Sequence, residues 1–172
     1  KKERYSTSIN GFKELIDNNV KVIFTVDCGT LSFDAINYAN KKKIDVIVLD
    51  HHQSEIKLPS AYSIINPNRL DDRSNLQYLC AAGVSFMFLV SLNRALRLNK
   101  WFEKFNVDEP DLINFLDLVS LGTVCDVVPL TGLNRALVAQ GLKIMARRDN
   151  VGLRALSDVA SIAEAPTTYH AG

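Results

Sequence analysis

The chain has 172 residues, of which 47% are hydrophobic and 23% charged, and its formal net charge is +1. The length suits one ordinary globular domain with a hydrophobic core. The near-neutral charge argues against a broad basic surface that binds nucleic acid non-specifically. No apolar run approaches the length of a membrane span, and the polar N-terminus lacks the apolar stretch of a signal peptide. We therefore expect no membrane association and a cytoplasmic location.

The chain has three cysteines, at positions 28, 80 and 125. Their odd number and wide spacing favour reduced thiols in a reducing compartment over a disulfide framework or a zinc site.

Residues 21–27 (KVIFTVD) and 44–50 (IDVIVLD) are short apolar runs rich in β-branched residues, and each ends in Asp. Unbroken apolarity of this kind is typical of strands buried on both faces, as in a parallel sheet. The segment between them, residues 31–42, has the apolar spacing of an amphipathic helix, and Gly29 provides a turn after the first strand. Together these segments predict a βαβ unit.

Further elements follow along the chain. Residues 61–66 predict a third strand, which Pro67 ends. Apolar periodicity predicts three further helices, over residues 79–98 (buried as far as Val90), 111–126 and 131–148, followed by a weakly patterned tail from residue 149. The predicted fold class is α/β, with a parallel β-sheet flanked by helices.

Two of the chain's three histidines lie side by side at the end of the second predicted strand, in VIVLDHHQ. Ligands of parallel α/β sheets bind outside the carboxyl ends of the strands, where Asp27 and Asp50 both lie. If the two strands are neighbours, both carboxylates share a crevice with His51 and His52. Such oxygen and imidazole donors suit a divalent ion such as Mn²⁺, and Asp50 could orient a ligating histidine. Aspartates at strand ends are also common turn and capping residues, so that alternative stays open.

A second candidate is Asp126, within the apolar run LGTVCDVVPL at residues 121–130. A charged group in such surroundings is costly unless it is paired or coordinated. The alternative is that Asp126 caps a helix or faces solvent where the helix ends before Pro129.

Four motifs, TVDCGT, VLDHHQ, LCAAGVSF and LGTVCDVVPL, occur in this order. In this order they resemble the core of the RecJ family, which belongs to the DHH phosphoesterase superfamily. The resemblance extends from about Arg4 to Leu156.

The resemblance implies a metal-dependent exonuclease that uses Mn²⁺ or Mg²⁺ to degrade single-stranded DNA from 5′ to 3′ in DNA repair and recombination. It makes single-stranded DNA the expected partner, and it names no protein partner. It assigns metal binding to Asp27, His51 and Asp126, support of the site to Asp50, and contact with the substrate phosphate to His52.

The family's first motif, Asp-x-Asp on an earlier strand, is expected before Lys1, and Ser8–Gly11 stands where the family has a glycine-rich stretch. The family's second domain and its OB domain are expected beyond the tail. We therefore expect residues 1–156 to form a partial DHH domain, incomplete at its N-terminus, and residues 157–172 to lead toward the second domain. Weak or no exonuclease activity is expected of the isolated chain.

Asn66 and Arg69, in the loop after the third strand, are weaker candidates for substrate contact. Two other functions stay open. One is a DHH-family phosphatase, oligonucleotidase or pyrophosphatase that acts on small phosphorylated molecules. The other is a remnant of the family without catalytic activity.

Overall fold

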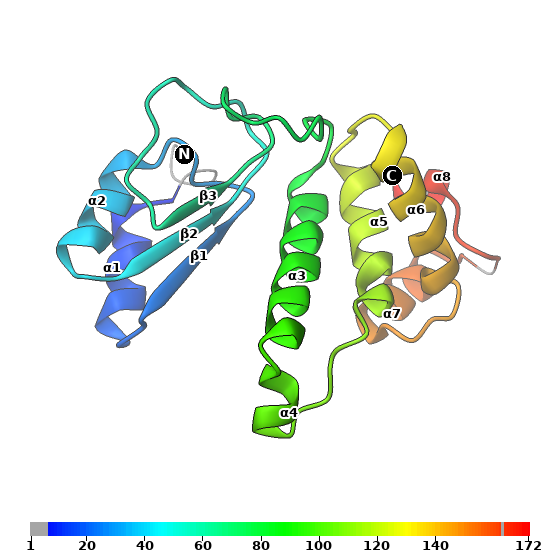
Figure 1. Cartoon of the computed structure of the whole chain (residues 1–172). Helices are drawn as coiled ribbons and strands as arrows, with labels where there is room; N and C mark the ends of the chain where they lie inside the picture. Colours follow the sequence, from blue (N-terminus) through cyan, green and yellow to red (C-terminus); the bar gives the residue numbers. More distant parts are fainter. Residues whose placement is uncertain (1–6, 163) are drawn as a thin grey trace. The chain divides into compact units, whose positions relative to one another are not determined.

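The computed structural model of the chain describes residues 7–162 and 164–172. The chain forms two compact units, residues 1–85 and 86–172, each of which is described by itself (Figure 1). Arg4, which was matched above to the RecJ family, lies outside the described residues.

The first unit contains a parallel sheet of three strands in the order β1-β2-β3. The strands are β1 (Val22–Val26), β2 (Asp45–Leu49) and β3 (Ser63–Ile65). In the β1–β2 pair Val26 lies opposite Leu49, so the two strands end at the same level. The predicted α/β class, the three strands and their parallel pairing are confirmed.

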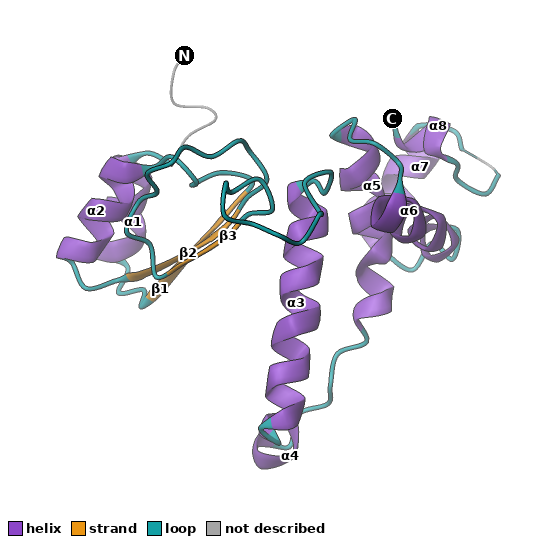
Figure 2. Ribbon diagram, turned by 45° about the horizontal axis from the view of Figure 1, so that its top comes forward, coloured by secondary structure: helices purple, strands orange, loops and turns teal. Residues whose placement is uncertain are grey.

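Helices α1 (Ile9–Asp17) and α2 (Phe33–Lys41) cover the same face of this sheet (Figure 2). The helix α2 was predicted from its apolar spacing, whereas α1 was not. The side chain of Ser8 caps α1, because its Oγ accepts a hydrogen bond from Gly11 N at 3.1 Å. The core between helices and sheet is formed by Phe12, Ile23, Ala35, Ile36, Ala39, Ile44, Val46 and Val48.

The opposite face of β1 is exposed in the described structure. Val22, Phe24 and Val26 are exposed at 42%, 49% and 50%, while Ile23, between the first two, is exposed at only 4%. The prediction that this strand is buried on both faces is therefore wrong. An unbroken apolar run shows that the side chains of a strand tolerate burial. Which faces of the strand are covered depends on the neighbouring elements, and helices α1 and α2 cover only one face of β1.

The helix α3 (Ala81–Leu98) begins in the first unit and continues into the second. Its first turns are buried, but Leu89 and Val90 are each exposed at 39%, so the predicted burial as far as Val90 is wrong. By length and composition alone α3 could cross a membrane, with a mean hydropathy of 1.2 and 28% of its span buried. The core helix of a soluble protein also meets this criterion, so α3 does not decide the expectation of no membrane association, which stays a prediction.

The second unit contains α4 (Trp101–Phe105), α5 (Leu116–Cys125) and α6 (Gly132–Met145). A short 3₁₀ helix, η1 (Leu112–Phe115), precedes α5, so the helix predicted over residues 111–126 begins as a tighter turn. Helices α5 and α6 pack closely against each other at Gly141, where a Cβ atom would lie 2.0 Å from the Leu116 carbonyl oxygen. The close approach of these two backbones therefore requires glycine.

The tail from residue 149 was predicted to be weakly patterned, but it contains α7 (Val151–Val159) and α8 (Thr168–Ala171). Asn150 caps α7, because its Oδ1 accepts hydrogen bonds from Gly152 N and Leu153 N at 3.1 and 3.2 Å. The predicted domain boundary after residue 156 falls within α7 and stays a prediction.

Candidate metal centre

The ends of β1 and β2 bring Asp27 and His51 together. Asp27 N donates to Leu49 O at 3.0 Å, which continues the ladder between the two strands by one step. Beyond that bond, His51 Nε2 lies 3.1 Å from Asp27 Oδ1. The predicted juxtaposition at the carboxyl ends of the strands is therefore present.

The turn after β1 is held in an unusual backbone conformation. Asp27 has a φ of 62°, in the left-handed region that aspartate adopts more readily than most residues with a side chain. Gly29 has a φ of 115°, and a Cβ atom at this position would lie 2.4 Å from Thr25 Oγ1. The chain can therefore turn back over the sheet edge only with glycine at position 29, which keeps Asp27 at the strand end.

Asp50 lies behind these groups and is only 1% exposed. Its Oδ1 accepts hydrogen bonds from His51 N at 2.8 Å, from His52 N at 3.3 Å and from His52 Nδ1 at 2.7 Å. Its Oδ2 accepts from Thr30 N at 3.0 Å. Burial alone would raise the pKa of Asp50, but the hydrogen bonds from Thr30, His52 and His51 outweigh it and lower the pKa to about 2.

The low pKa of Asp50 determines which nitrogen of His52 carries the proton. At neutral pH the Asp50 carboxylate is ionised and can only accept hydrogen bonds. His52 Nδ1, at 2.7 Å from Asp50 Oδ1, must therefore be the donor. In the neutral ring the lone pair is then on Nε2, where it can serve as a ligand or an acceptor.

Asp27, His51 and His52 each offer one ligand atom, and these atoms lie within 4.8 Å of one another. The 3.1 Å between Asp27 Oδ1 and His51 Nε2 matches the ~3 Å expected between neighbouring ligands of an octahedral ion with bonds of ~2.1 Å. Burial, together with the charges of Asp50 and Asp27, raises the pKa of the nearby Cys28 thiol. The three grouped donors are thus a carboxylate oxygen and two imidazole nitrogens, a set that fits a divalent transition-metal ion such as Mn²⁺.

Asp126 lies in the second unit, as the exposed C-cap residue of α5. This position agrees with the alternative that Asp126 lies where the helix ends. However, a carboxylate at a helix C-terminus is unfavourable, because that end of the helix carries partial negative charge. Val127, the next residue, has a φ of 56°, which is a strained conformation for a β-branched side chain.

Asn66 and Arg69 use their side chains within the first unit. Asn66 is 4% exposed, and its Nδ2 lies 2.8 Å from both Thr30 Oγ1 and His52 O. Arg69 Nη1 donates to Ile64 O at 2.7 Å, and its guanidinium also pairs with Asp71. Substrate contact by Asn66 or Arg69 stays a prediction.

The sequence did not predict the roles of Thr30 and Asn68. Both bond to the loop of residues 50–52 that follows β2, which we refer to as the histidine loop. Thr30 donates its N–H to Asp50, and Asn68 Nδ2 lies 2.6 Å from His51 O. Both are uncharged and lie in loops that follow strands. The repeated asparagine in Asn66-Pro67-Asn68 was the available signal, because asparagine side chains often bond to nearby backbone groups.

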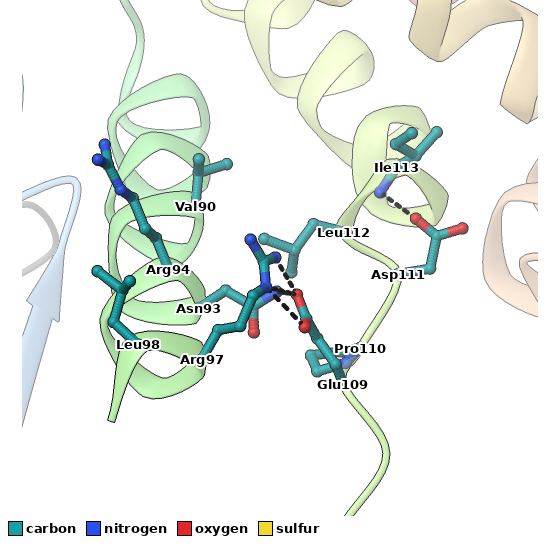
Figure 3. Close-up of a pocket in the computed structure, with 10 residues that line it drawn as sticks. All are labelled: Val90, Asn93, Arg94, Arg97, Leu98, Glu109, Pro110, Asp111, Leu112 and Ile113. Atoms are coloured by element: carbon teal, nitrogen blue, oxygen red, sulfur yellow. Dashed lines mark hydrogen bonds and ion pairs between the residues drawn. The ribbon is translucent and has the colours of Figure 1, made fainter. Parts of the chain in front are cut away.

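A separate surface pocket of about 570 Å³ lies in the second unit, between α3 and the segment before α5 (Figure 3). Its main charged groups are bonded to one another. Arg97 Nε donates to Glu109 Oε2 at 2.9 Å, and Asn93 Nδ2 donates to Glu109 Oε1 at 2.8 Å. These bonds hold the segment that contains Glu109 against α3. Arg97, Asn93 and Glu109 therefore have a structural role.

Comparison with known families gives a match to the DHH family, N-terminal domain, over residues 3–123. The chain is 42% identical to the single-stranded-DNA-specific exonuclease RecJ of Escherichia coli (strain K12), over 82% of this chain and 25% of that protein. It is 37% identical to the protein of the same name from Haemophilus influenzae, over 91% of this chain and 27% of the relative. The chain thus spans about a quarter of the length of these relatives.

Two solved structures are also similar. A crystal structure of exonuclease RecJ bound to manganese has a TM-score of 0.77 and 27% identity, covering 99% of this chain and 40% of that chain. RecJ from Thermus thermophilus in complex with Mn²⁺ has a TM-score of 0.73 and 27% identity, covering 95% of this chain and 23% of that chain. The match over residues 3–123, supported by these relatives, shows that the chain belongs to the DHH family.

Proposed function

We propose that the chain is the DHH domain of a RecJ-type exonuclease, which hydrolyses phosphodiester bonds of single-stranded DNA with Mn²⁺ or Mg²⁺. The observation that carries the proposal is the pairing of Asp27 and His51 at the sheet edge, with the buried Asp50 behind. The relatives named as single-stranded-DNA-specific exonucleases support the substrate. Related RecJ structures that contain Mn²⁺ or Mg²⁺ support the metal.

In this proposal each side chain has a separate role. Asp27 and His51 hold the metal, and His52 faces the substrate phosphate through Nε2. Asp50 holds both histidines through its three Oδ1 hydrogen bonds. When bound, the ion would acidify a water molecule and offset negative charge on the phosphodiester.

We also propose Asp126 as a metal ligand, on the resemblance of LGTVCDVVPL to the family's fourth motif. The supporting observation is its position, because Asp126 is exposed at the C-terminal end of α5, where a carboxylate is unfavourable for the helix dipole. Replacement of Asp126 by Asn should weaken Mn²⁺ binding. Unchanged affinity would leave Asp126 with only its helix-end role.

The metal assignment is tested by titrating Mn²⁺ into the chain by calorimetry. We expect His51→Ala to lose most of the binding. His170→Ala is the matched control, because His170 is a histidine in the short helix α8, in the other unit. Equal affinities for the chain and His51→Ala would remove His51 from the ligand set.

The activity is tested on single-stranded DNA labelled at its 5′ or 3′ end, with this chain and with a longer protein that contains it. The longer protein should release nucleotides from the 5′ end, lose activity with a chelator, and regain it with Mn²⁺ or Mg²⁺. The isolated chain should show weak activity or none. Faster hydrolysis of dinucleotides or pyrophosphate than of long DNA would instead favour a phosphatase, oligonucleotidase or pyrophosphatase. A longer protein that hydrolyses none of these substrates would be a remnant without activity.

We further propose a role in DNA repair and recombination, and a cytoplasmic location without membrane association. Helix α3 lies within the part of the chain that matches the DHH family, which favours a place in the folded domain over a membrane span. Cell fractionation of the longer protein tests this location, and recovery in the membrane pellet would contradict it.

A further inference from the structure

The segment after β3, Asn66-Pro67-Asn68, bonds to the backbone of both tandem histidines. Asn68 Nδ2 donates to His51 O at 2.6 Å, and Asn66 Nδ2 donates to His52 O at 2.8 Å. We refer to the two asparagines, Asn66 and Asn68, as the amide clamp. Two successive carbonyl groups of the histidine loop are therefore each held by a side-chain amide.

The amide clamp is itself fixed by further bonds. Asn66 Oδ1 accepts a hydrogen bond from Asn68 N at 2.8 Å, which sets the two amides relative to each other. Asn66 Nδ2 also donates to Thr30 Oγ1 at 2.8 Å, and Thr30 N donates to Asp50 Oδ2 at 3.0 Å. The network thus connects the loops that follow all three strands of the sheet.

Burial gives this network little freedom to rearrange. Thr30 and Asn66 are exposed at 1% and 4%, and Asp50 at 1%. A buried amide without a hydrogen-bond partner is destabilising, because its desolvation is not offset by a new bond. The bonds between Asn66 and its neighbours therefore favour one arrangement of the loop.

The histidine loop needs such support because His51 and His52 lie outside any helix or strand. No ladder bonds of regular structure fix their backbone in this described part of the chain. Asp50 binds the N–H group of each histidine, and the amide clamp binds the C=O group of each. The backbone of each histidine is thus held at its N–H group by Asp50 and at its C=O group by an asparagine amide.

We propose that Asn66 and Asn68 are positioning residues for the metal centre. They hold the backbone of residues 51 and 52 so that the two imidazoles are directed toward Asp27, and they do not contact the metal. This inference rests on the proposed metal-binding function. The burial of Asn66 and its internal bonds favour positioning over substrate contact.

The test compares Asn68→Ala with a matched control, Asn40→Ala. In the control, Asn40 Nδ2 donates to Ser60 O at 2.7 Å, which is also a bond from an asparagine amide to the carbonyl of a distant loop residue in the same unit. Both variants should lower the urea midpoint of unfolding. Only Asn68→Ala should weaken Mn²⁺ affinity, by about 10-fold or more, as removal of an outer partner of a metal ligand does. Asn68→Ser takes the place of Asn68→Ala if the latter does not fold.

A second measurement needs no metal. Amide hydrogen exchange at His51 and His52 reports whether their N–H groups stay bonded to Asp50. In the metal-free chain we expect these two amides to exchange at least ~10-fold faster in Asn68→Ala than in the parent and in Asn40→Ala. Unchanged exchange together with parent-like Mn²⁺ affinity would overturn the role of the amide clamp.

Mn²⁺ affinity and amide exchange together distinguish failure of the proposed metal function from failure of the positioning role. If the parent chain binds no Mn²⁺ but exchange accelerates only in Asn68→Ala, the clamp holds the loop and the proposed metal function fails. If the parent chain binds Mn²⁺ through His51 and Asn68→Ala behaves like Asn40→Ala in both measurements, the metal function stands and the positioning role is wrong.

Discussion

The buried carboxylate of Asp50 holds the exposed imidazole of His52, with Oδ1 and Nδ1 2.7 Å apart. The Asp50 side chain is 2% exposed, whereas that of His52 is 61% exposed. A fixed, buried charge thus orients a ring at the surface and selects the tautomer with its lone pair on Nε2. This relationship supports the proposal that Asp50 holds the histidines of the metal centre.

The replacement Asp50→Asn tests that relationship. The amide keeps the size of the side chain but loses the charge and an acceptor oxygen, so we expect Mn²⁺ affinity to fall by about 10- to 100-fold. The free energy of unfolding should fall by about 1–3 kcal/mol, because a buried donor loses its partner. Asp45→Asn, at the exposed start of β2, is the control and should change neither quantity appreciably. The tautomer itself is checked by nitrogen NMR of the parent chain, where a neutral His52 ring that carries its proton on Nε2 would contradict the assignment.

Stability should also depend on pH through Asp50. Its pKa is lowered from 3.8 to about 2, so the unfolded chain binds more protons than the folded chain between these values. The stabilisation, about 2 kcal/mol, is complete above the unfolded pKa and is lost as pH falls through the folded pKa. Urea unfolding at pH 6 and at pH 2.5 should therefore show a larger loss for the parent than for Asp50→Asn. Equal losses in the two chains would contradict the assignment, since all other carboxylates are common to both.

Substitutions at Asp27 should separate metal binding from backbone strain. The φ of 62° is tolerated by Asn and Gly, but it costs a residue such as Ala about 1–2 kcal/mol. We expect Asp27→Asn and Asp27→Gly to be about as stable as the parent and Asp27→Ala to be less stable, measured by urea unfolding. All three should lose at least ~10-fold in Mn²⁺ affinity, because a carboxylate ligand is removed. Parent-like affinity in Asp27→Asn would exclude the carboxylate as a required ligand.

The close contact of α5 and α6 predicts a large effect for Gly141→Ala. The added Cβ would lie 2.0 Å from Leu116 O and 2.6 Å from Ser120 Cβ, so the helices must separate. Overpacking of this kind should cost at least ~2 kcal/mol in the free energy of unfolding. Gly152→Ala is the control, because its nearest neighbour would be 3.5 Å away, and it should be neutral or stabilising by up to ~1 kcal/mol. Similar unfolding midpoints for the two variants would contradict the packing argument.

The sequence by itself determined much of the first unit. Two apolar runs that each end in Asp, joined by an amphipathic segment, were enough to predict a βαβ unit in a parallel sheet, and a shared edge for Asp27 and His51 if the two strands were neighbours. This worked because the hydrophobic pattern sets the strands, and a parallel crossover places their carboxyl ends together. The pairing of β1 with β2 agrees with that reasoning.

Only the tertiary structure decided which groups hold the histidines. Thr30 and Asn68 are uncharged loop residues with no periodic pattern, and their roles depend on hydrogen bonds between segments far apart in the chain. The exposed face of β1 and the exposed middle of α3 were missed for a related reason. Apolar composition records that a side chain tolerates burial, whereas burial itself depends on which neighbours the fold supplies.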